Sequence, residues 1–238
     1  MLQVMSVLFL ATFIRSAFGF GEALVAVPLL ALIMPVEVAA PVAVLVSITV
    51  AGVVVAQDWR HVHFRSAGWL FLSTLVGTPL GLLLLTAIEG KIVKAILAVV
   101  IITFSTYALI SRKHATLKND RLSWFFGLGA GILGGAFGMN GPPLVIYGSL
   151  RGWSPQHFRA TLQGYFLPAS MIVMCGYWLT GLWTPVVTHH YLTVLPAVVV
   201  AIFLGRAVNQ RMNGHSFLLY VHIGLIAAGA MLLFQTIA

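Results

Sequence analysis

The sequence predicts an all-α polytopic membrane protein with two inverted repeats, each a re-entrant helical hairpin plus three transmembrane helices. Of the 238 residues, 60% are hydrophobic and only 8% are charged, whereas about 25% are charged in a soluble domain. The apolar stretches are long and are separated by short polar loops. Similar glycine-bearing interruptions lie at 16–21 and 135–141, at matching places in two halves. We therefore expect a single transmembrane domain over 1–238, with repeats over 1–112 and 120–238.

Six stretches have the length of a full membrane span, because a hydrocarbon core of about 30 Å needs around 20 helical residues. They cover 37–57, 65–86, 91–110, 156–180, 188–208 and 215–236. The regions 3–34 and 121–151 are too long for one span, and glycines interrupt both near their middles. Each region is therefore either one long tilted helix or a hairpin that enters and leaves the membrane on the same side.

The distribution of Lys and Arg favours the hairpins, because positive charges gather in cytoplasmic loops. If each interrupted region crosses the membrane once, the loops on the two sides carry six Lys and Arg each. If each is a hairpin, ten fall on one side and only Lys91 and Lys94 on the other. Each half then crosses an odd number of times, so the halves are inverted and both termini face away from the cytoplasm. The hairpin tips are expected to approach one another near the midplane.

The second interruption comprises Gly138, Met139, Asn140 and Gly141. Pro142 follows and suits a helix start, where its missing N–H costs nothing. Glycine lets a ligand approach the backbone, and free N–H groups at a helix start favour an anion. The Asn140 amide adds a donor for a ligand oxygen. We expect a binding site here; the alternative is a Gly/Pro kink that allows close helix packing.

The first interruption comprises Phe18, Gly19, Phe20, Gly21 and Glu22. Its glycines also open the backbone to a ligand, although no proline follows them, so its backbone is expected to line the same site. Its aromatic rings, together with Phe137 of the other half, are candidates to wall the site against water, although such rings are more often core. At each tip the negative end of the incoming arm opposes the positive end of the outgoing arm, so the helix dipoles do not choose between an anion and a cation.

Arg15 favours an anion. It lies one turn before the first tip, about 18 Å along an arm that starts at the outer surface. A charge at that depth costs several kcal/mol and usually marks a substrate or relay site. The alternative is an internal ion pair with Glu22, and both interpretations hold together if Glu22 balances Arg15 in the empty site. Proton uptake by Glu22 is a hypothesis for coupling.

Three further polar residues are candidates to line the site. Arg159 opens the span after the second hairpin, as either a cytoplasmic anchor or a ligand for the anion. Gln163 lies one turn deeper, and Tyr147 lies on the outgoing arm. Neither the pair His61 and His63 nor the pair His189 and His190 forms a strong metal signature with a carboxylate or cysteine, and neither a cofactor motif nor paired catalytic carboxylates occur. The net charge of +8 is expected to reflect cytoplasmic loops rather than nucleic-acid binding.

Several of these residues together resemble a known family. They are Gly19-Phe20-Gly21 followed by Pro28-Leu29-Leu30, then Gly134-Gly135-Ala136-Phe137-Gly138 running into Gly141-Pro142-Pro143, then Tyr147 and Phe158-Arg159-Ala160-Thr161. The chain resembles the sulfite exporter (TauE/SafE) family, also called the toluene-sulfonate uptake permease family, over essentially its whole length. The resemblance implies secondary transport of small sulfur-containing anions such as sulfite, sulfoacetate or other sulfonates. Glu22 departs from the pattern, because many members continue there with glycine or an apolar residue.

We therefore expect a secondary transporter that exports such an anion across the bacterial cytoplasmic membrane by alternating access, with proton coupling through Glu22 as an added hypothesis. The expected partners are a small inorganic or organosulfur anion and the lipid bilayer, with no cofactor, metal or nucleic acid. The oligomeric state is open, a homodimer included. Two alternatives are a passive anion channel and a cation or metal carrier that uses Glu22 and the hairpin carbonyls. An enzyme is not expected, because no catalytic set is present.

Overall fold

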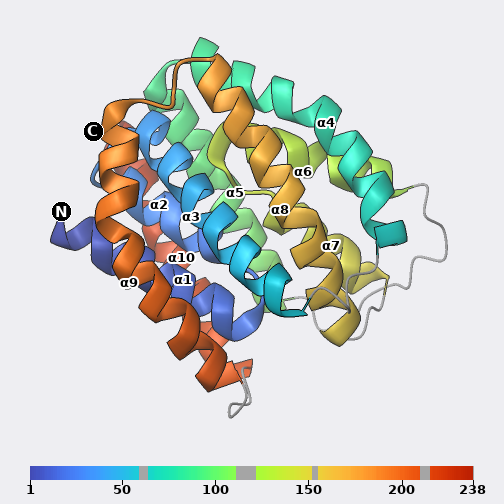
Figure 1. The fold of residues 1–238 in the computed structure, drawn as a ribbon. Helices are drawn as coiled ribbons and strands as arrows, with labels where there is room; N and C mark the ends of the chain where they lie inside the picture. Colours follow the sequence, from blue (N-terminus) through green and yellow to red (C-terminus); the bar gives the residue numbers. More distant parts are fainter. Residues whose placement is uncertain (59–63, 111–121, 152–154, 210–214, 238) are drawn as a thin grey trace.

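The computed structural model describes residues 1–58, 64–110, 122–151, 155–209 and 215–237, and over these ranges the chain is helical, with no β-strand (Figure 1). The helices of these ranges are α1 (Leu2–Phe18), α2 (Glu22–Ala31), α3 (Val36–Asp58), α4 (Phe64–Ala87), α5 (Gly90–Ile110), α6 (Ser123–Phe137), α7 (Gly141–Leu150), α8 (Pro155–Leu179), α9 (Pro185–Asn209) and α10 (His215–Ile237). The prediction of an all-helical chain is confirmed for the described residues.

The six predicted spans correspond to α3, α4, α5, α8, α9 and α10. Within the described residues, four helical segments are long and apolar enough to cross a membrane. They are Val36–Ala56, Gly68–Ala87, Gly90–Ile110 and Pro185–Val208. The helices α8 and α10 contain 25 and 23 residues, a length that suits a hydrocarbon core of about 30 Å.

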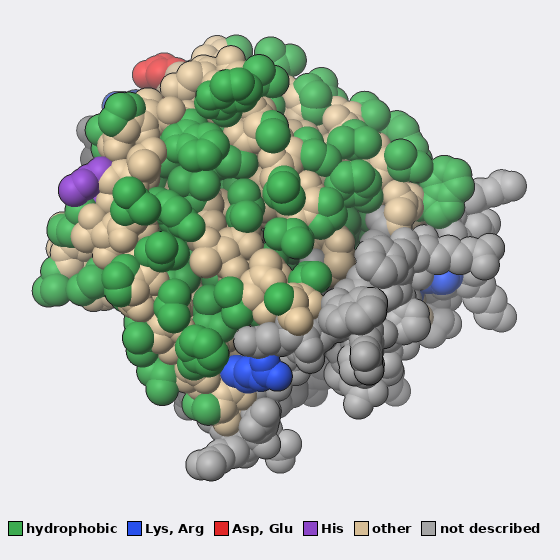
Figure 2. All heavy atoms as spheres, in the orientation of Figure 1, with side chains coloured by type: hydrophobic (Ala, Val, Ile, Leu, Met, Phe, Trp, Pro, Cys, Tyr) green, Lys and Arg blue, Asp and Glu red, His purple; other side chains and the backbone are tan. Residues whose placement is uncertain are grey.

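The outer surface of the helices is apolar. Large hydrophobic side chains are exposed on several of them, among them Trp69 of α4, Phe125 of α6, Phe203 of α9 and Phe234 of α10. Figure 2 shows hydrophobic side chains over most of one face, with charged and histidine side chains at its margins. Water-soluble proteins rarely expose such continuous apolar surface. The chain is therefore a multi-pass membrane protein with an apolar outer surface suited to lipid.

The first interruption is a break between α1 and α2. The helix α1 ends at Phe18, and Gly19 and Gly21 have φ angles of 86° and 97°. These left-handed conformations suit glycine because it has no Cβ to clash with the backbone. The N–H of Gly19 donates to the Arg15 carbonyl at 2.6 Å, and α2 then begins at Glu22. The two glycines therefore separate the helices where the sequence predicts.

The second interruption is a break between α6 and α7. Gly138 has a φ of 66°, and its N–H donates to the Gly134 carbonyl at 2.7 Å. The N–H of Met139 donates to the Leu133 carbonyl at 3.1 Å, so the last turn of α6 is capped by its own backbone. A Cβ at Gly138 would lie 2.6 Å from Cγ2 of Val44. Both the backbone angle and the close approach of α3 therefore require glycine here.

The interrupted helices pack closely against long helices. Gly127, Gly131 and Gly135 of α6 lie against α4, and a Cβ at Gly131 would be 2.5 Å from the Thr74 carbonyl oxygen. On the other side of the molecule, a Cβ at Gly205 of α9 would be 2.6 Å from Cβ of Ser16 on α1. Small residues at such crossings let two backbones approach, which is a principal source of helix association in a bilayer.

Among the four spans, the α3 segment is the most buried. Of an apolar stretch of 18 residues, 61% is inside the molecule in α3, compared with 28% in α9. It contacts α1, α2, α8 and α9. Because α3 runs through the interior, its side chains can reach both helix breaks. This arrangement positions the site described below.

Candidate functional site

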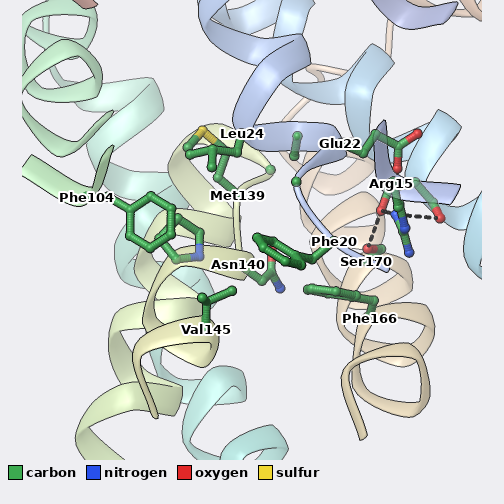
Figure 3. A pocket seen from close by; sticks show the side chains of 16 residues that line it. Arg15, Phe20, Glu22, Leu24, Phe104, Met139, Asn140, Val145, Phe166 and Ser170 are labelled. Atoms are coloured by element: carbon green, nitrogen blue, oxygen red, sulfur yellow. Dashed lines mark hydrogen bonds and ion pairs between the residues drawn. The ribbon is translucent and has the colours of Figure 1, made fainter. Parts of the chain in front are cut away.

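The two helix breaks border one cavity, in which about 30 Å³ is open to the centre of a water molecule (Figure 3). Its lining combines both breaks with side chains of α3, α5 and α8. The lining residues are Arg15, Phe20, Gly21, Glu22, Ala23, Leu24, Ser47, Phe104, Gly138, Met139, Asn140, Gly141, Pro142, Val145, Phe166 and Ser170. One water needs roughly 10–15 Å³ by this measure, so the cavity has room for about two. An oxyanion would therefore enter with movement of the lining side chains.

A buried ion pair occupies one wall of the cavity. Nη1 of Arg15 donates to Oε2 of Glu22 at 2.5 Å, and Oγ1 of Thr12 donates to Oε1 of Glu22 at 3.1 Å. The side chains of Arg15 and Glu22 are 3% and 1% exposed. These two residues bind each other in this structure, and they are the charged members of the lining set. Because the carboxylate offsets the guanidinium, the pair has no net charge.

The helix break itself makes this pair possible. Arg15 lies in the last turn of α1 and Glu22 is the first residue of α2. A carboxylate in the first turn of a helix is stabilised by the exposed N–H groups there, and a guanidinium in the last turn by the exposed carbonyls. The glycine turn between them brings the two helix ends together, so each charge meets a favourable dipole and an opposite charge.

Two neighbouring helices complete the surroundings of Arg15. Its Nη1 also donates to Oγ of Ser47 on α3, at 2.6 Å, and lies 3.4 Å from the Ser47 carbonyl oxygen. Oγ of Ser47 lies 3.5 Å from Oγ of Ser170 on α8. The Arg15 guanidinium carbon is 5.1 Å from the ring centroid of Phe166, within the range of a cation–π interaction. Four helices therefore hold the guanidinium in place.

The second break contributes a polar amide. Asn140 is 5% exposed, and its Nδ2 has no hydrogen-bond partner within the described residues. The nearby Tyr165 hydroxyl is 2.5 Å from Oγ1 of Thr74. Two prolines follow Gly141 in the first turn of α7 and carry no N–H. The Asn140 side chain is therefore an important donor on this side of the cavity, and a buried donor without an acceptor favours a ligand that supplies one.

The rest of the lining is apolar. Phe104, Met139, Leu24 and Val145 lie away from the ion pair, and Phe20 lies between this group and the ion pair in Figure 3. The cavity thus joins a charged wall to an apolar wall. Low-polarity walls strengthen electrostatic contacts inside the cavity because they exclude water.

The structure brings most of the sequence-predicted residues together and separates others. The lining contains the predicted residues Arg15, Phe20, Gly21, Glu22, Gly138, Met139, Asn140, Gly141 and Pro142. Four predicted residues are not in the lining set: Phe18, Gly19, Phe137 and Tyr147. Phe137 is buried in the core, and Tyr147 packs against Phe126 with ring centroids 5.5 Å apart. Arg159 and Gln163 lie on α8, with side chains outside the described part of the structure.

Sequence reasoning missed Ser47, Ser170, Phe104 and Phe166, which lie 25 or more positions from the first break. A serine or phenylalanine in a long apolar helix has no local signal that distinguishes a cavity position from a packing position. Thr12 had a usable signal: it lies one turn before Arg15 on the same helix, and residues three apart share a helix face.

The family model described as sulfite exporter TauE/SafE matches residues 4–232, which is nearly the whole chain. No match is found among curated proteins or among solved structures.

Proposed function

This chain belongs to the sulfite exporter TauE/SafE family, and from that premise we propose that it is a secondary transporter that exports small sulfur-containing anions by alternating access. Family membership implies export of sulfite or a related sulfonate across a membrane. Sulfite, sulfoacetate and related sulfonates are the proposed substrates. The observation that carries the proposal is a buried arginine beside a cavity to which both helix breaks contribute.

The pattern of helix contacts supports two structural repeats. Suppose that each helix is replaced by the one in the same position of the other half, α1 by α6, α2 by α7 and so on, and the reverse. Many helix contacts then become other observed contacts. The contact of α1 with α9 becomes that of α6 with α4, α1 with α2 becomes α6 with α7, and α3 with α9 becomes α8 with α4. The contacts of α3 with α8, α5 with α10 and α2 with α7 convert into themselves. Such a pairing is what a two-fold axis produces. We take repeat 1 as 1–112 and repeat 2 as 120–238.

Helix lengths support re-entrant hairpins in these repeats. The 17 residues of α1 and the 15 of α6 span about 25 Å and 22 Å, less than a hydrocarbon core of about 30 Å. Each packs against the short helix that follows it. The start of α1 and the end of α10 lie toward the same side in Figure 1. With three spans after each hairpin, both termini face the extracytoplasmic side of the bacterial cytoplasmic membrane in this proposal.

The anion binds, in this proposal, between the two breaks. Arg15 supplies positive charge, the Asn140 amide donates to an oxygen of the substrate, and backbone near Gly21 and Gly141 replaces hydration. Inverted-repeat transporters bind substrate near the midplane at interrupted helices, where backbone groups are open to a ligand. Phe18, Gly19, Phe137, Tyr147, Arg159 and Gln163 remain candidate substrate-binding residues on the basis of the sequence.

Glu22 and the substrate are alternative partners of the Arg15 guanidinium in this mechanism. In the empty site its carboxylate neutralises Arg15 at 2.5 Å. An entering oxyanion competes for the same guanidinium, and a proton on Glu22 releases Arg15 to the substrate, which leaves the buried site neutral for a monoanion and with one negative charge for a dianion. This exchange couples substrate flux to protons without a second binding site.

The same contacts bear on the alternatives. A cation carrier would bind its ion at Glu22, but the guanidinium beside that carboxylate repels cations. Within the described residues, no group of three His, Cys, Asp or Glu could hold a metal ion. A passive anion channel would use the same cavity, and a counterflow measurement distinguishes it from a carrier.

Counterflow in proteoliposomes tests the proposal. Vesicles containing the purified chain are loaded with unlabelled sulfite and diluted into a trace of radioactive sulfite. A carrier accumulates label transiently above equilibrium, and a channel equilibrates without an overshoot. Arg206→Gln, at an exposed position in the last turn of α9, is the matched control and is expected to retain the overshoot. Absence of an overshoot with sulfite, thiosulfate and sulfoacetate would contradict the proposal.

A further inference from the structure

Two serines of the cavity, Ser47 and Ser170, direct their hydroxyl groups to other helices, unlike several hydroxyl residues that bond to their own helix. Ser73, Thr74 and Thr78 each donate to a carbonyl three or four residues earlier in their own helix. Ser170 makes no such bond within the described residues; its hydrogen bond there is the 3.5 Å contact with Ser47. A serine in a helix can satisfy its hydroxyl on a carbonyl of its own helix, although Ser105, which is also buried, makes no such bond within the described residues. Because Ser170 also lines the cavity, its hydroxyl is available to a ligand there.

The chemistry of Arg15 sets the direction of these hydrogen bonds. A guanidinium can only donate, so Oγ of Ser47 accepts from Nη1 at 2.6 Å. The proton of Ser47 then points toward another acceptor, and Oγ of Ser170 is its other side-chain partner in the described residues. If Ser170 accepts from Ser47, its own proton is left to donate. Both serines line the cavity and are only 6% and 5% exposed, so bulk water does not satisfy that proton.

The distance between the serines leaves room for a ligand contact. Hydroxyl–hydroxyl hydrogen bonds are usually 2.5–3.0 Å long, and the two Oγ atoms are 3.5 Å apart. The contact is therefore weak, and an oxygen placed in the cavity would compete well for the Ser170 proton. Arg15 attracts any anion, so neutral donors such as the Ser170 hydroxyl help to decide which anion the site holds most strongly.

We infer that Ser170 is a substrate-binding donor and that Ser47 is the positioning residue that orients both Ser170 and Arg15. This inference rests on the proposed anion transport and adds a determinant of specificity to it. A donated hydrogen bond strengthens with the charge on the accepting oxygen. The Ser170 hydroxyl therefore favours sulfite dianion, with two charges over three oxygens, over a sulfonate monoanion, with one charge over three oxygens.

The test is equilibrium binding to the purified full chain at pH 8, with sulfite and methanesulfonate as probes in separate titrations. Removal of a donor to a charged acceptor weakens binding by roughly 10- to 100-fold. Ser170→Ala is expected to show such a loss for sulfite and a smaller loss for methanesulfonate. Ser170→Thr keeps the hydroxyl and is expected to retain most of the sulfite affinity. Ser105→Ala is the matched control, because Ser105 is also buried and unbonded within the described residues but is outside the lining set.

The outcomes separate this inference from the proposed function. If the unaltered chain binds sulfite and Ser170→Ala binds it equally well, the inference is wrong and the transport proposal stands. Equal losses for both probes, or an equal loss in Ser170→Thr, would indicate a packing role and also overturn it. If the unaltered chain binds neither probe, both proposals fail. Ser170→Cys replaces the hydroxyl with a weak donor of similar size and gives the same comparison if the alanine variant does not purify.

Discussion

Replacing Arg15 by Gln provides the sharpest measurement on the buried ion pair. The substitution removes the 2.5 Å contact with Glu22 and the 2.6 Å contact with Ser47, at a side chain that is 3% exposed. Removing one member of a buried pair costs about 3–5 kcal/mol, because the other charge remains buried without its partner. We expect R15Q to lower the free energy of unfolding by this amount, which is about two to three and a half powers of ten in the unfolding equilibrium constant.

The double variant R15Q/E22Q separates the energy of the interaction between the two residues from the effect of each residue by itself. It leaves neither charge, so we expect it to recover much of the stability lost in R15Q, giving a coupling energy of about 2–4 kcal/mol in the double-mutant cycle. Reversible unfolding in mixed detergent micelles, followed by circular dichroism, measures all four free energies. R206Q changes an exposed arginine and is expected to shift stability by less than about 0.5 kcal/mol.

The same variants test whether Arg15 serves the substrate. A folded R15Q/E22Q protein is expected to bind sulfite at least 100-fold more weakly than the unaltered chain, because it has lost the positive charge of the cavity while remaining assembled. If the stability losses of R15Q and E22Q add up to the loss in the double variant within about 0.5 kcal/mol, the two residues do not interact in the folded protein. Unchanged sulfite affinity in the double variant would refute the assignment of Arg15 as the charge that binds the anion.

Three further predictions follow from particular contacts. Glu22→Gln is expected to keep counterflow active but to flatten its dependence on pH, since residue 22 no longer exchanges a proton; a pH profile identical to that of the unaltered chain would exclude the coupling role. Gly131→Ala places a Cβ 2.5 Å from the Thr74 carbonyl and is expected to destabilise the chain by about 1–3 kcal/mol. Gly52→Ala, with open space around its Cβ, is the control and is expected to be neutral or up to about 1 kcal/mol stabilising in the same unfolding assay; equal losses would contradict the close α4–α6 contact. In a cysteine-free background, Lys91→Cys is expected to react with an impermeant maleimide in intact cells, and Arg206→Cys only after the membrane is opened; the reverse pattern would overturn the orientation.

The helix breaks were predictable because their causes are local. A glycine that adopts a left-handed backbone conformation avoids a clash within its own residue and its neighbours. Gly19, Gly21 and Gly138 are therefore identifiable by their position in the apolar sequence, and all three have positive φ angles. The spans are predictable for a similar reason, since span length depends only on the rise per residue and the bilayer thickness.

The partners of Arg15 were only partly predictable. Glu22 is seven residues away, across a turn that brings the helix ends together, and the sequence already suggested it as an alternative to a substrate. Only the structure shows which of these interpretations applies to the empty site, because a short glycine turn can direct the two side chains together or apart. In the structure the two side chains face each other.

The sequence by itself determined where this chain is helical, where its helices break, and that a charge lies deep within the apolar part. The tertiary structure decided which residues meet that charge: Ser47 on α3 and Phe166 and Ser170 on α8, up to 155 positions from Arg15. The physical reason is that steric rules act over a few neighbouring residues, whereas contacts between helices depend on which faces pack together. Helices that are apolar on nearly every side carry little periodic pattern to specify those faces, and shape complementarity among ten packed segments selects them instead.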